Sequence, residues 1–413
     1  MKRLTEACES ALPPVWLSAL RRRFGHGVPS PCSTTTLAGL VASDKRTGVC
    51  DVIQLGGCPR LPLPGFSVSG DFAAVETVRG RIGNRLALER YDRLVAGPVV
   101  QPQVDSFVAV LAEARVCQSA GLVVTAENAL LADVSDLAFV ADDPAGPLRV
   151  SHLPRPRRTP QTIAVLTTGP HHNYYHWMIE ALPRLDLYER SGVSIDCFYA
   201  PIRTRFQRES LHLLGISQER ILPATRQTHL APARLLASSF TGSPSLAKTD
   251  YLSRRLGQHA GLLAGRSRRI FIARAGRRAR SIVNERELLR SLEPLGFERF
   301  RLESMPLLEQ VSLFQQAECV VGPHGAGLTN LMFCRPGTQV IEIGTPYRPW
   351  SCFYEIAYHR GLAYHLHLAT PVQISHFNPA TGVGDSGLRV GPAELAGIIE
   401  TLLAGRTPVR FAA

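Results

Sequence analysis

Short apolar runs alternate with longer amphipathic segments through the last third of this 413-residue chain. The apolar runs are residues 270–273, 297–301, 319–321, 339–343 and 363–368. The segments between them that have the length and pattern of helices are residues 284–294, 306–317, 327–334 and 350–360. Strands that alternate with helices run parallel, because each helix returns the chain to the same end of the sheet. The pattern therefore predicts a doubly wound parallel sheet in an α/β fold.

One strand-to-helix junction in this region is rich in glycine. Residues 318–334 run from a short apolar strand through His324-Gly325-Ala326-Gly327 into an apolar helix. Glycine lets a ligand approach the backbone, and the first amides of a helix are unpaired donors at the positive end of its dipole. The spacing is neither that of the dinucleotide fingerprint nor that of the phosphate loop of nucleotide hydrolases. Two interpretations stay open, an anion-binding loop and a tight structural corner.

An arginine-rich segment precedes this junction. Residues 266–280 contain seven arginines around a small apolar run. Arginine presents a planar fork of donors that matches phosphate oxygens, and open α/β sheets place ligand-binding loops at strand ends. We expect Arg274, directly after the predicted strand, to contact a phosphate. Most of the other arginines fit a solvated basic loop.

A third cluster lies further upstream, after another strand-like run. We expect Asn173 to cap a helix on which His176, Glu180 and Arg184 recur every four residues. A carboxylate raises the basicity of a neighbouring histidine, so His176 and Glu180 can act as a base and its orienting partner. A routine ion pair between Glu180 and Arg184, beside a half-buried histidine, is the alternative. Pro183 should kink or end the helix, because it lacks a backbone donor.

Together the three segments resemble glycosyltransferase family 61. Its members carry a His-Asn-Tyr-Tyr-His-Trp-like segment, an arginine-rich segment ending in Asn-Glu, and a Gly-x-His-Gly-Ala-Gly-Leu-Thr-Asn segment. The matching residues are 173–185, 271–285 and 320–333, in the family's order, within a resemblance that spans roughly residues 100–370. Similar sequences commonly begin the arginine segment with Ser-Arg-x-Asp, whereas this chain has Ala-Arg-Ala-Gly. That departure weakens any role for an acidic residue or a serine hydroxyl in this loop.

The resemblance implies a GT-B-like α/β fold, in which two Rossmann-like domains face a cleft. We expect a partly β accessory region over residues 1–100 and the N-terminal, acceptor-side domain over residues 101–245. The nucleotide-sugar-binding domain is expected over residues 246–390, after a turn-rich linker. A final helix within residues 391–413 is expected to pack back on the N-terminal domain, as such helices commonly do in GT-B proteins.

The resemblance also implies a function, the inverting transfer of a sugar from a nucleotide sugar to a hydroxyl group. Similar bacterial proteins are associated with capsular and other surface polysaccharides, so a glycan or a lipid-linked acceptor is expected. Inversion requires one base and stabilisation of the departing diphosphate. The residues expected to act as base or orienting partner are His176 and Glu180. Those expected to bind the donor are Arg274, Arg280, His324, Gly325, Ala326, Gly327 and Glu342, and those expected to position the acceptor are Asn173 and Tyr175.

Some of these assignments have open alternatives. Either His176 or Glu180 could be the base. Glu342 ends a predicted strand, where an acid can accept ribose hydroxyl groups or can simply be a surface charge. A non-catalytic polysaccharide-assembly or nucleotide-binding protein would keep the phosphate loop and is the alternative function. The sequence does not identify the sugar, the nucleotide, the acceptor or the oligomeric state.

Metal and cofactor motifs are weak in this chain. The sequence has no Asp-x-Asp motif, and Asp142-Asp143 lies in a turn-like stretch that suits turn chemistry better than a cation site. His359, His365 and His367 lack the spacing of a usual zinc site and are expected to be structural. Because arginines can neutralise a diphosphate, we expect no metal and no cofactor beyond the nucleotide-sugar substrate.

Charge and cysteine content bear on partners and location. The net charge of +12 comes mostly from arginine. A diphosphate site uses part of it, and contact with anionic lipid could use more. Nucleic-acid binding is the rival explanation, but no recognised nucleic-acid motif supports it. Nine cysteines without a C-x-x-C pair, and no signal-like or membrane-spanning stretch, predict a cytoplasmic protein that is soluble or peripheral at the inner face of the cell membrane.

Overall fold

A computed structural model describes most of the chain from residue 152 onward and parts of the chain before it. The described residues are 28–29, 33–36, 48–57, 66–82, 88, 105–135, 152–239, 242–260, 267–274, 279–347, 350–378 and 383–405. Asp142 and Asp143 lie outside the described residues.

The C-terminal half contains a six-stranded parallel sheet in the order β15-β14-β16-β17-β18-β4. Its strands are β4 (Ser67–Gly70), β14 (Arg268–Ile272), β15 (Phe297–Phe300), β16 (Ala317–Pro323), β17 (Gln339–Gly344) and β18 (Ala363–Leu368). Five of the six lie where the apolar runs predict strands, and all pair in parallel. The doubly wound parallel sheet predicted from the sequence is therefore confirmed for this half of the chain.

Helices cover both faces of this sheet. They are α11 (Glu285–Leu292), α12 (Leu307–Gln315), α13 (Cys352–His359) and α14 (Pro392–Leu403), with the 3₁₀ turns η4 (Glu293–Leu295), η5 (Leu302–Ser304) and η6 (Ala326–Phe333). Along β14, Ile270 and Ile272 join the apolar core with α12 and α13, while Phe271 joins the core with α11 and α14. This alternation follows from the two-residue period of a strand, whose successive side chains point to opposite faces.

The second sheet has ten strands and a parallel centre. That centre is β12 (Ile221–Pro223), β11 (Cys197–Ala200), β10 (Arg157–Val165) and β13 (His229–Ser238), in this order. Antiparallel pairs extend the sheet beyond β13 through β5 (Asp105–Leu111), β3 (Val49–Gly57), β6 (Arg115–Cys117), β7 (Leu122–Val124) and β8 (Ala129–Leu131), and β2 (Ser33–Thr35) adds in parallel to β8. Two small antiparallel pairs are separate, β1 (Val28–Pro29) with β9 (His152–Leu153) and β19 (Thr370–Asn378) with β20 (Val383–Arg389).

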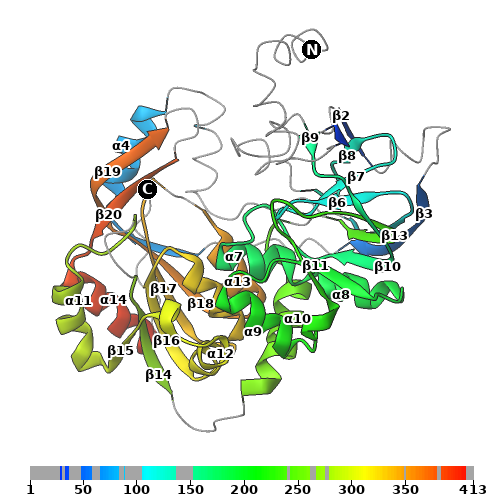
Figure 1. Ribbon diagram of the computed structural model, residues 1–413. Coiled ribbons are helices and arrows are strands. Elements are labelled where there is room, and N and C mark those ends of the chain that lie inside the picture. The colour runs from blue at the N-terminus through cyan, green and yellow to red at the C-terminus, as the bar shows by residue number, and fades with distance from the viewer. Residues whose placement is uncertain are drawn as a thin grey trace, which may run out of the picture.

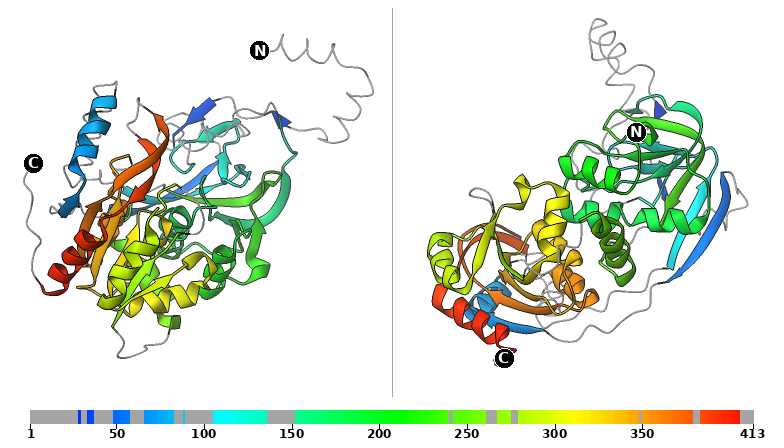
Figure 2. Two further views of the ribbon diagram at one scale, coloured as in Figure 1. Left: turned by 90° about the vertical axis from the view of Figure 1, so that its left-hand side faces the viewer. Right: turned by 90° about the horizontal axis from the view of Figure 1, so that it is seen from below.

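The helices of this half follow the parallel strands. They are α7 (Tyr174–His176), the π-helical turn η1 (Trp177–Ala181), α8 (Arg184–Ser191), α9 (Arg205–Leu213), the 3₁₀ turn η2 (Gln218–Arg220), α10 (Leu246–Gly257) and the 3₁₀ turn η3 (Gln258–Ala260). Figures 1 and 2 show two lobes, one green and cyan around β10 to β13 and one yellow to red around β14 to β18. One apolar core joins them, since Trp177 and Tyr251 belong to the same buried cluster as Leu331 and Phe353.

The first hundred residues contribute to both sheets. Strand β3 pairs with β5 in the ten-stranded sheet, whereas β4 pairs with β18 in the six-stranded sheet. Helix α4 (Phe72–Arg81) follows β4 and lies beside β19 and β20 in Figure 1. Strands β2, β3 and β4 of this region therefore extend the sheets of the two lobes, and the accessory region expected over residues 1–100 stays a prediction.

The C-terminal helix differs from its expected position. Helix α14 packs on α11 and β17, where Leu395 and Ile399 join the apolar core of the six-stranded sheet. The expectation that it packs back on the N-terminal domain is wrong for the described residues. The apolar face of α14 indicates that this helix is buried. The face of β16 and β17 that it covers is also apolar, and these strands are closer to α14 in sequence than the N-terminal domain is. None of the helices in the described part of the chain is both long and apolar enough to cross a membrane.

A polar seam attaches β4 to the edge of the six-stranded sheet. His365 accepts or donates at both ring nitrogens, to Ser67 at 2.7 Å and to Ser69 at 2.8 Å, and Ser69 also lies 2.9 Å from Nδ1 of His367. Both rings are 1% exposed. Burial lowers the pKa of each histidine to about 4, and for His365 the neighbouring His367 adds to this effect. These histidines are structural, as expected.

We expect this seam to make the protein acid-sensitive. Because the folded pKa is about 4 and the ordinary value is 6.5, the unfolded chain binds more protons as the pH falls through this window. Stability should therefore be fully present above about pH 6.5 and decrease towards pH 4, by on the order of 3 kcal/mol for each histidine. Urea unfolding from pH 8 to pH 4 measures it. The double variant His365→Gln, His367→Gln should lose less stability as the pH falls. An unchanged dependence of stability on pH in this variant would contradict the assignment. His212→Gln, at an exposed histidine, is the control.

Candidate functional site

The strand order gives each sheet a topological switch point. From β14 the chain moves to β15 on one side and then returns to β16 on the other, so the loops after β14 and β16 diverge. From β10 it moves to β11 and β12 on one side and returns to β13 on the other. Open α/β sheets bind ligands at the carboxyl ends of strands at such points. The loops that follow β14, β16, β10 and β13 are therefore the places to look for a site.

At the first switch point, Arg274 lies against the glycine loop. Its Nη1 atom donates to the backbone oxygen of His324 at 3.0 Å. A Cβ atom at Gly325 would stand 2.1 Å from Nη1 of Arg274, so this contact requires glycine. Gly322 is also closely packed, since a Cβ there would lie 2.9 Å from Cβ of Ile272. The structure thus brings together the arginine and the loop that the sequence predicted as phosphate ligands.

The helix after this loop differs in type from the prediction. Residues 326–333 form the 3₁₀ helix η6, in which the amide of Leu328 donates to the oxygen of Gly325 at 2.9 Å. Ala326 and Gly327 are half-buried at its first turn. A 3₁₀ helix also leaves its first amides without intrahelical partners, so the backbone donors at the loop are retained.

His324 and Glu342 form a buried pair beneath the loop. Nδ1 of His324 lies 2.5 Å from Oε1 of Glu342, and the Tyr364 hydroxyl donates to Oε2 at 2.7 Å. The two residues are 3% and 1% exposed, so Glu342 is not the surface charge that one interpretation allowed. Burial, and then the Glu342 carboxylate, raise the pKa of Tyr364 well above 10.0, so this hydroxyl stays a donor. With Nδ1 engaged by Glu342, Nε2 is the nitrogen of His324 that can face a ligand.

Arg280 lies at some distance along the same loop. Its backbone has a φ of 65°, its amide donates to the oxygen of Ser386 at 2.7 Å, and its Nε is 3.9 Å from Oδ1 of Asp385. These contacts tie Arg280 to β20. Its contact with a donor stays a prediction.

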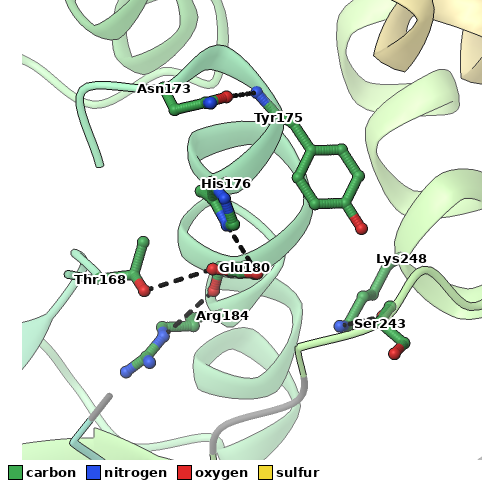
Figure 3. A network of polar contacts seen from close by, with 8 residues as sticks. All are labelled: Thr168, Asn173, Tyr175, His176, Glu180, Arg184, Ser243 and Lys248. Atoms are coloured by element: carbon green, nitrogen blue, oxygen red, sulfur yellow. Dashed lines mark hydrogen bonds and ion pairs between the residues drawn. The ribbon is translucent and has the colours of Figure 1, made fainter. Parts of the chain in front are cut away.

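At the second switch point, His176 and Glu180 face each other on one helix (Figure 3). Asn173 caps the helix through a bond from the Tyr175 amide at 2.9 Å, as expected. Nδ1 of His176 lies 2.8 Å from Oε1 of Glu180, and the Thr168 hydroxyl, directly after β10, donates to Oε2 at 3.4 Å. Glu180 is 7% exposed. The carboxylate thus orients the histidine, and the tautomer with its hydrogen on Nδ1 carries its lone pair on Nε2.

The alternative interpretation of Glu180 is a helix ion pair with Arg184. Nε of Arg184 donates to the backbone oxygen of Glu180 at 3.2 Å. The carboxylate oxygens of Glu180 are engaged by His176 and Thr168. The geometry therefore favours the interpretation in which Glu180 serves His176.

A π-helical turn carries this pair. The amide of Leu182 donates to the oxygen of Trp177, five residues back, at 2.9 Å, and α8 begins directly after Pro183. Pro183 cannot donate to the preceding turn, so the regular helix is interrupted here, as predicted. Indole Nε1 of Trp177 donates to Ser210 at 2.9 Å and anchors the turn to α9. Such π turns occur frequently at functional sites.

The two switch points are in contact. The Tyr174 hydroxyl donates to Oδ1 of Asn330 in η6 at 2.6 Å. The ring of Tyr175 lies 5.8 Å from that of Phe353, which in turn lies 4.9 Å from the ring of His324. The segment that contains His176 and the segment that contains the glycine loop therefore meet across the two lobes. Aromatic rings lie between His324 and the helix of His176.

Several contributing residues were missed in the sequence. Thr168 and Tyr364 donate to the predicted residues Glu180 and Glu342, and Phe353 contacts the rings of Tyr175 and His324. Asn330 accepts from Tyr174, which precedes the predicted Tyr175. Lys248, on α10 after β13, donates to the oxygen of Ser243 at 2.6 Å and lies near Tyr175 in Figure 3. The rule that ligands bind where parallel strands diverge could have selected Thr168 and Lys248, because both follow switch-point strands. No comparable signal marks Phe353 or Tyr364.

Comparison with known proteins finds similarity to glycosyltransferases. Residues 174–341 match the family described as Glycosyltransferase 61. A stretch of 88 residues is 32% identical to the EGF domain-specific O-linked N-acetylglucosamine transferase of Drosophila melanogaster, covering 21% of this chain and 17% of that protein. A stretch of 69 residues is 39% identical to the beta-1,2-xylosyltransferase of Arabidopsis thaliana, covering 16% and 13%. The beta-1,2-xylosyltransferase RCN11 of Oryza sativa subsp. japonica is 39% identical over 61 residues, covering 15% and 11%.

The matched segments are short compared with these relatives, since the chain matches less than a fifth of the length of each. The family match itself begins at Tyr174 and ends at Ile341, so it contains His176, Glu180, Arg274 and the glycine loop. The family match therefore includes segments from both switch points.

Proposed function

We propose that this protein is an inverting glycosyltransferase that moves a sugar from a nucleotide-sugar donor to a hydroxyl group of a glycan or lipid-linked acceptor. The observation that carries the proposal is the pairing of two built sites. An oriented histidine and carboxylate stand at one switch point, an arginine lies on a glycine loop at the other, and aromatic rings connect them. A sugar transfer with inversion needs one base on one side and a stabilised leaving group on the other.

His176 is the proposed base. Its Nε2 lone pair removes the proton of the acceptor hydroxyl as that oxygen attacks the anomeric carbon. Glu180, held by Thr168, then stabilises the imidazolium that forms, and it keeps the ring in the required tautomer. Glu180 stays the alternative base. Asn173 and Tyr175, at the start of the same helix, are the proposed acceptor-positioning residues.

The glycine loop is the proposed diphosphate site. Negative charge grows on the diphosphate as the bond to the sugar breaks, and preorganised donors stabilise that charge. Arg274, Nε2 of His324 and the backbone amides of residues 325–327 supply such donors, with Arg280 as a further cation. These positive groups allow the reaction to proceed without a metal ion. Glu342 is proposed to orient His324. A contact between Glu342 and the ribose hydroxyl groups of the donor stays a prediction.

The two lobes are proposed to act as the acceptor-side and donor-side halves of a GT-B-like enzyme. The fold supports this proposal through two sheets, one parallel and one with a parallel centre, that have one switch point each. A bacterial surface polysaccharide is the proposed context, with the enzyme in the cytoplasm or at the inner face of the membrane. A non-catalytic nucleotide-binding protein is the alternative, but such a protein would have no use for an oriented base.

Turnover of a panel of nucleotide sugars tests the proposal. The purified protein is incubated with each donor and a mixture of glycan acceptors, with and without EDTA, and release of nucleoside diphosphate is measured. We expect one donor to be consumed at a rate that EDTA leaves unchanged, with inversion at the anomeric carbon by NMR. Tight nucleoside diphosphate binding without turnover of any donor would favour the non-catalytic alternative.

A further inference from the structure

A hollow lies beside Glu342, the residue that holds His324 of the glycine loop. It lies over the carboxyl ends of β17 and β18, between α4 and the segment before α13. Its walls are mainly apolar and include Phe66, Phe72, Val75, Trp350 and Leu366. No arginine or lysine lines it within the described part of the chain. Among the described residues, these walls therefore suit a largely apolar ring better than a phosphate group.

The polar end of the hollow is shared with the proposed diphosphate site. Glu342 and Tyr364 line the hollow, and the same Glu342 holds His324 of the loop. The rings of His324 and Trp350 are 6.3 Å apart. Any diphosphate bound by the loop would therefore begin directly beside this hollow.

His324 contacts residues of both regions. Its ring lies beside Phe353, which contacts Tyr175, the neighbour of His176 in sequence. Its ring also lies near Trp350 and its Nδ1 contacts Glu342, and both of these residues line the hollow. A nucleotide sugar has its diphosphate in the middle, with the sugar at one end and the nucleoside at the other. If the sugar reaches the base His176, the nucleoside must extend towards the hollow.

We propose that this hollow binds the nucleoside of the donor, and that residues 66–82, from the first hundred residues of the chain, form one of its walls. This inference rests on the proposed function. Phe72 on α4 and Trp350 before α13 are 40% and 45% exposed, so two large apolar rings that line the hollow are open to a ligand. A planar base packed on them would cover both. The polar end at Glu342, Tyr364, Ser351 and Thr345 offers partners for ribose hydroxyl groups.

The wall formed by residues 66–82 is firmly placed. The amide of Asp71 donates to the oxygen of Leu368 at 2.8 Å, and its carboxylate caps α4 by accepting from the Ala74 amide at 3.0 Å. Gly70 has a φ of 105°, and a Cβ there would stand 2.1 Å from the oxygen of Leu368. At the far end of α4, Arg81 donates to the Tyr347 hydroxyl at 3.1 Å. The turn between β4 and α4 therefore fixes Phe72 and Val75 over the sheet.

Comparison of two ligands by calorimetry tests the proposal. Inorganic pyrophosphate occupies the loop alone, while the tightest binder among uridine, guanosine, adenosine and cytidine diphosphate also occupies the hollow. We expect that nucleoside diphosphate to bind the wild-type protein at least about tenfold more tightly than pyrophosphate, since base stacking on aromatic side chains contributes at this level. Phe72→Ala should remove most of this advantage, and Val75→Trp, which fills the hollow, should remove all of it. Pyrophosphate affinity should not change in either variant.

The controls separate this proposal from the one on which it rests. Glu76→Ala lies on the same helix with a 70% exposed side chain and should behave as the wild type. Thermal unfolding of each variant identifies any variant that fails to fold. Phe72→Ala removes a side chain that is already 40% exposed, so this variant tests the hollow without filling it. If the nucleoside diphosphate advantage survives in both variants, the hollow is not the nucleoside site and the proposed function stands. If neither pyrophosphate nor any nucleoside diphosphate binds, the donor loop itself fails.

Discussion

His176→Ala and Glu180→Ala are each expected to lower the rate of sugar transfer by about 10²- to 10⁴-fold, the usual contribution of a positioned general base. His176 would lose the Nε2 atom that accepts the acceptor proton, and the Glu180 variant would lose the carboxylate that orients His176 at 2.8 Å. Because both residues lie away from the glycine loop, the affinity for nucleoside diphosphate should stay within about threefold, well below the effect of a lost charged hydrogen bond. Steady-state kinetics and calorimetry measure the two quantities.

Two further variants refine this test. Glu180→Gln keeps the size of the side chain and can still accept from His176, so it isolates the loss of charge. His212→Ala removes an exposed histidine from α9 and should transfer sugar at the wild-type rate. Near-normal transfer by both His176→Ala and Glu180→Ala would contradict the catalytic assignment. A loss confined to His176→Ala would leave Glu180 without a role in the reaction.

Arg274→Ala is expected to weaken nucleoside diphosphate binding by about 10²-fold, because hydrogen bonds from a charged donor contribute about 1.5–3 kcal/mol and the guanidinium can make two. kcat/KM should fall further, since the charge on the diphosphate grows in the transition state. Arg274→Lys should recover only part of the affinity, because a lysine lacks the planar fork of donors. Titration calorimetry with the preferred nucleoside diphosphate measures the change.

The control for this variant comes from the same lobe. Arg299 on β15 pairs with Glu285 on the surface, at 2.6 Å, and Arg299→Ala should leave nucleotide affinity unchanged. Arg274 also holds the His324 carbonyl, so thermal unfolding of Arg274→Ala separates loss of a ligand contact from collapse of the loop. Unchanged affinity in a folded Arg274→Ala protein would remove this residue from the donor site.

The C-terminal sheet could be predicted because its signal is local. Each of its five sequential strands is a short apolar run, and the four segments between them have helical periodicity, so that pattern alone gives both the elements and their parallel pairing. Strand β4 has no such signal. It is the four residues Ser-Val-Ser-Gly, and it joins the sheet through histidines almost 300 positions later in the chain. Its partner could not be found from local pattern.

The same distinction holds for the site. His176 and Glu180 could be paired from sequence because four residues make one turn of a helix. His324 and Glu342 are 18 positions apart on neighbouring strands, and their contact depends on the parallel register of β16 and β17. The sequence likewise predicted a helix after the glycine loop but not its 3₁₀ form. Helical type and long-range packing depend on the core around Leu328 and Leu331, which a single sequence does not display.

A crystal structure with the tightest-binding nucleoside diphosphate tests the central claim most directly, because that claim places the donor at one position. We expect the diphosphate at the carboxyl ends of β14 and β16, within hydrogen-bonding distance of Arg274, Nε2 of His324 and the amides of residues 325–327. The side of the diphosphate that carries the sugar in a donor should face His176. A nucleotide bound at any other place, or with its diphosphate directed away from His176, would contradict the account.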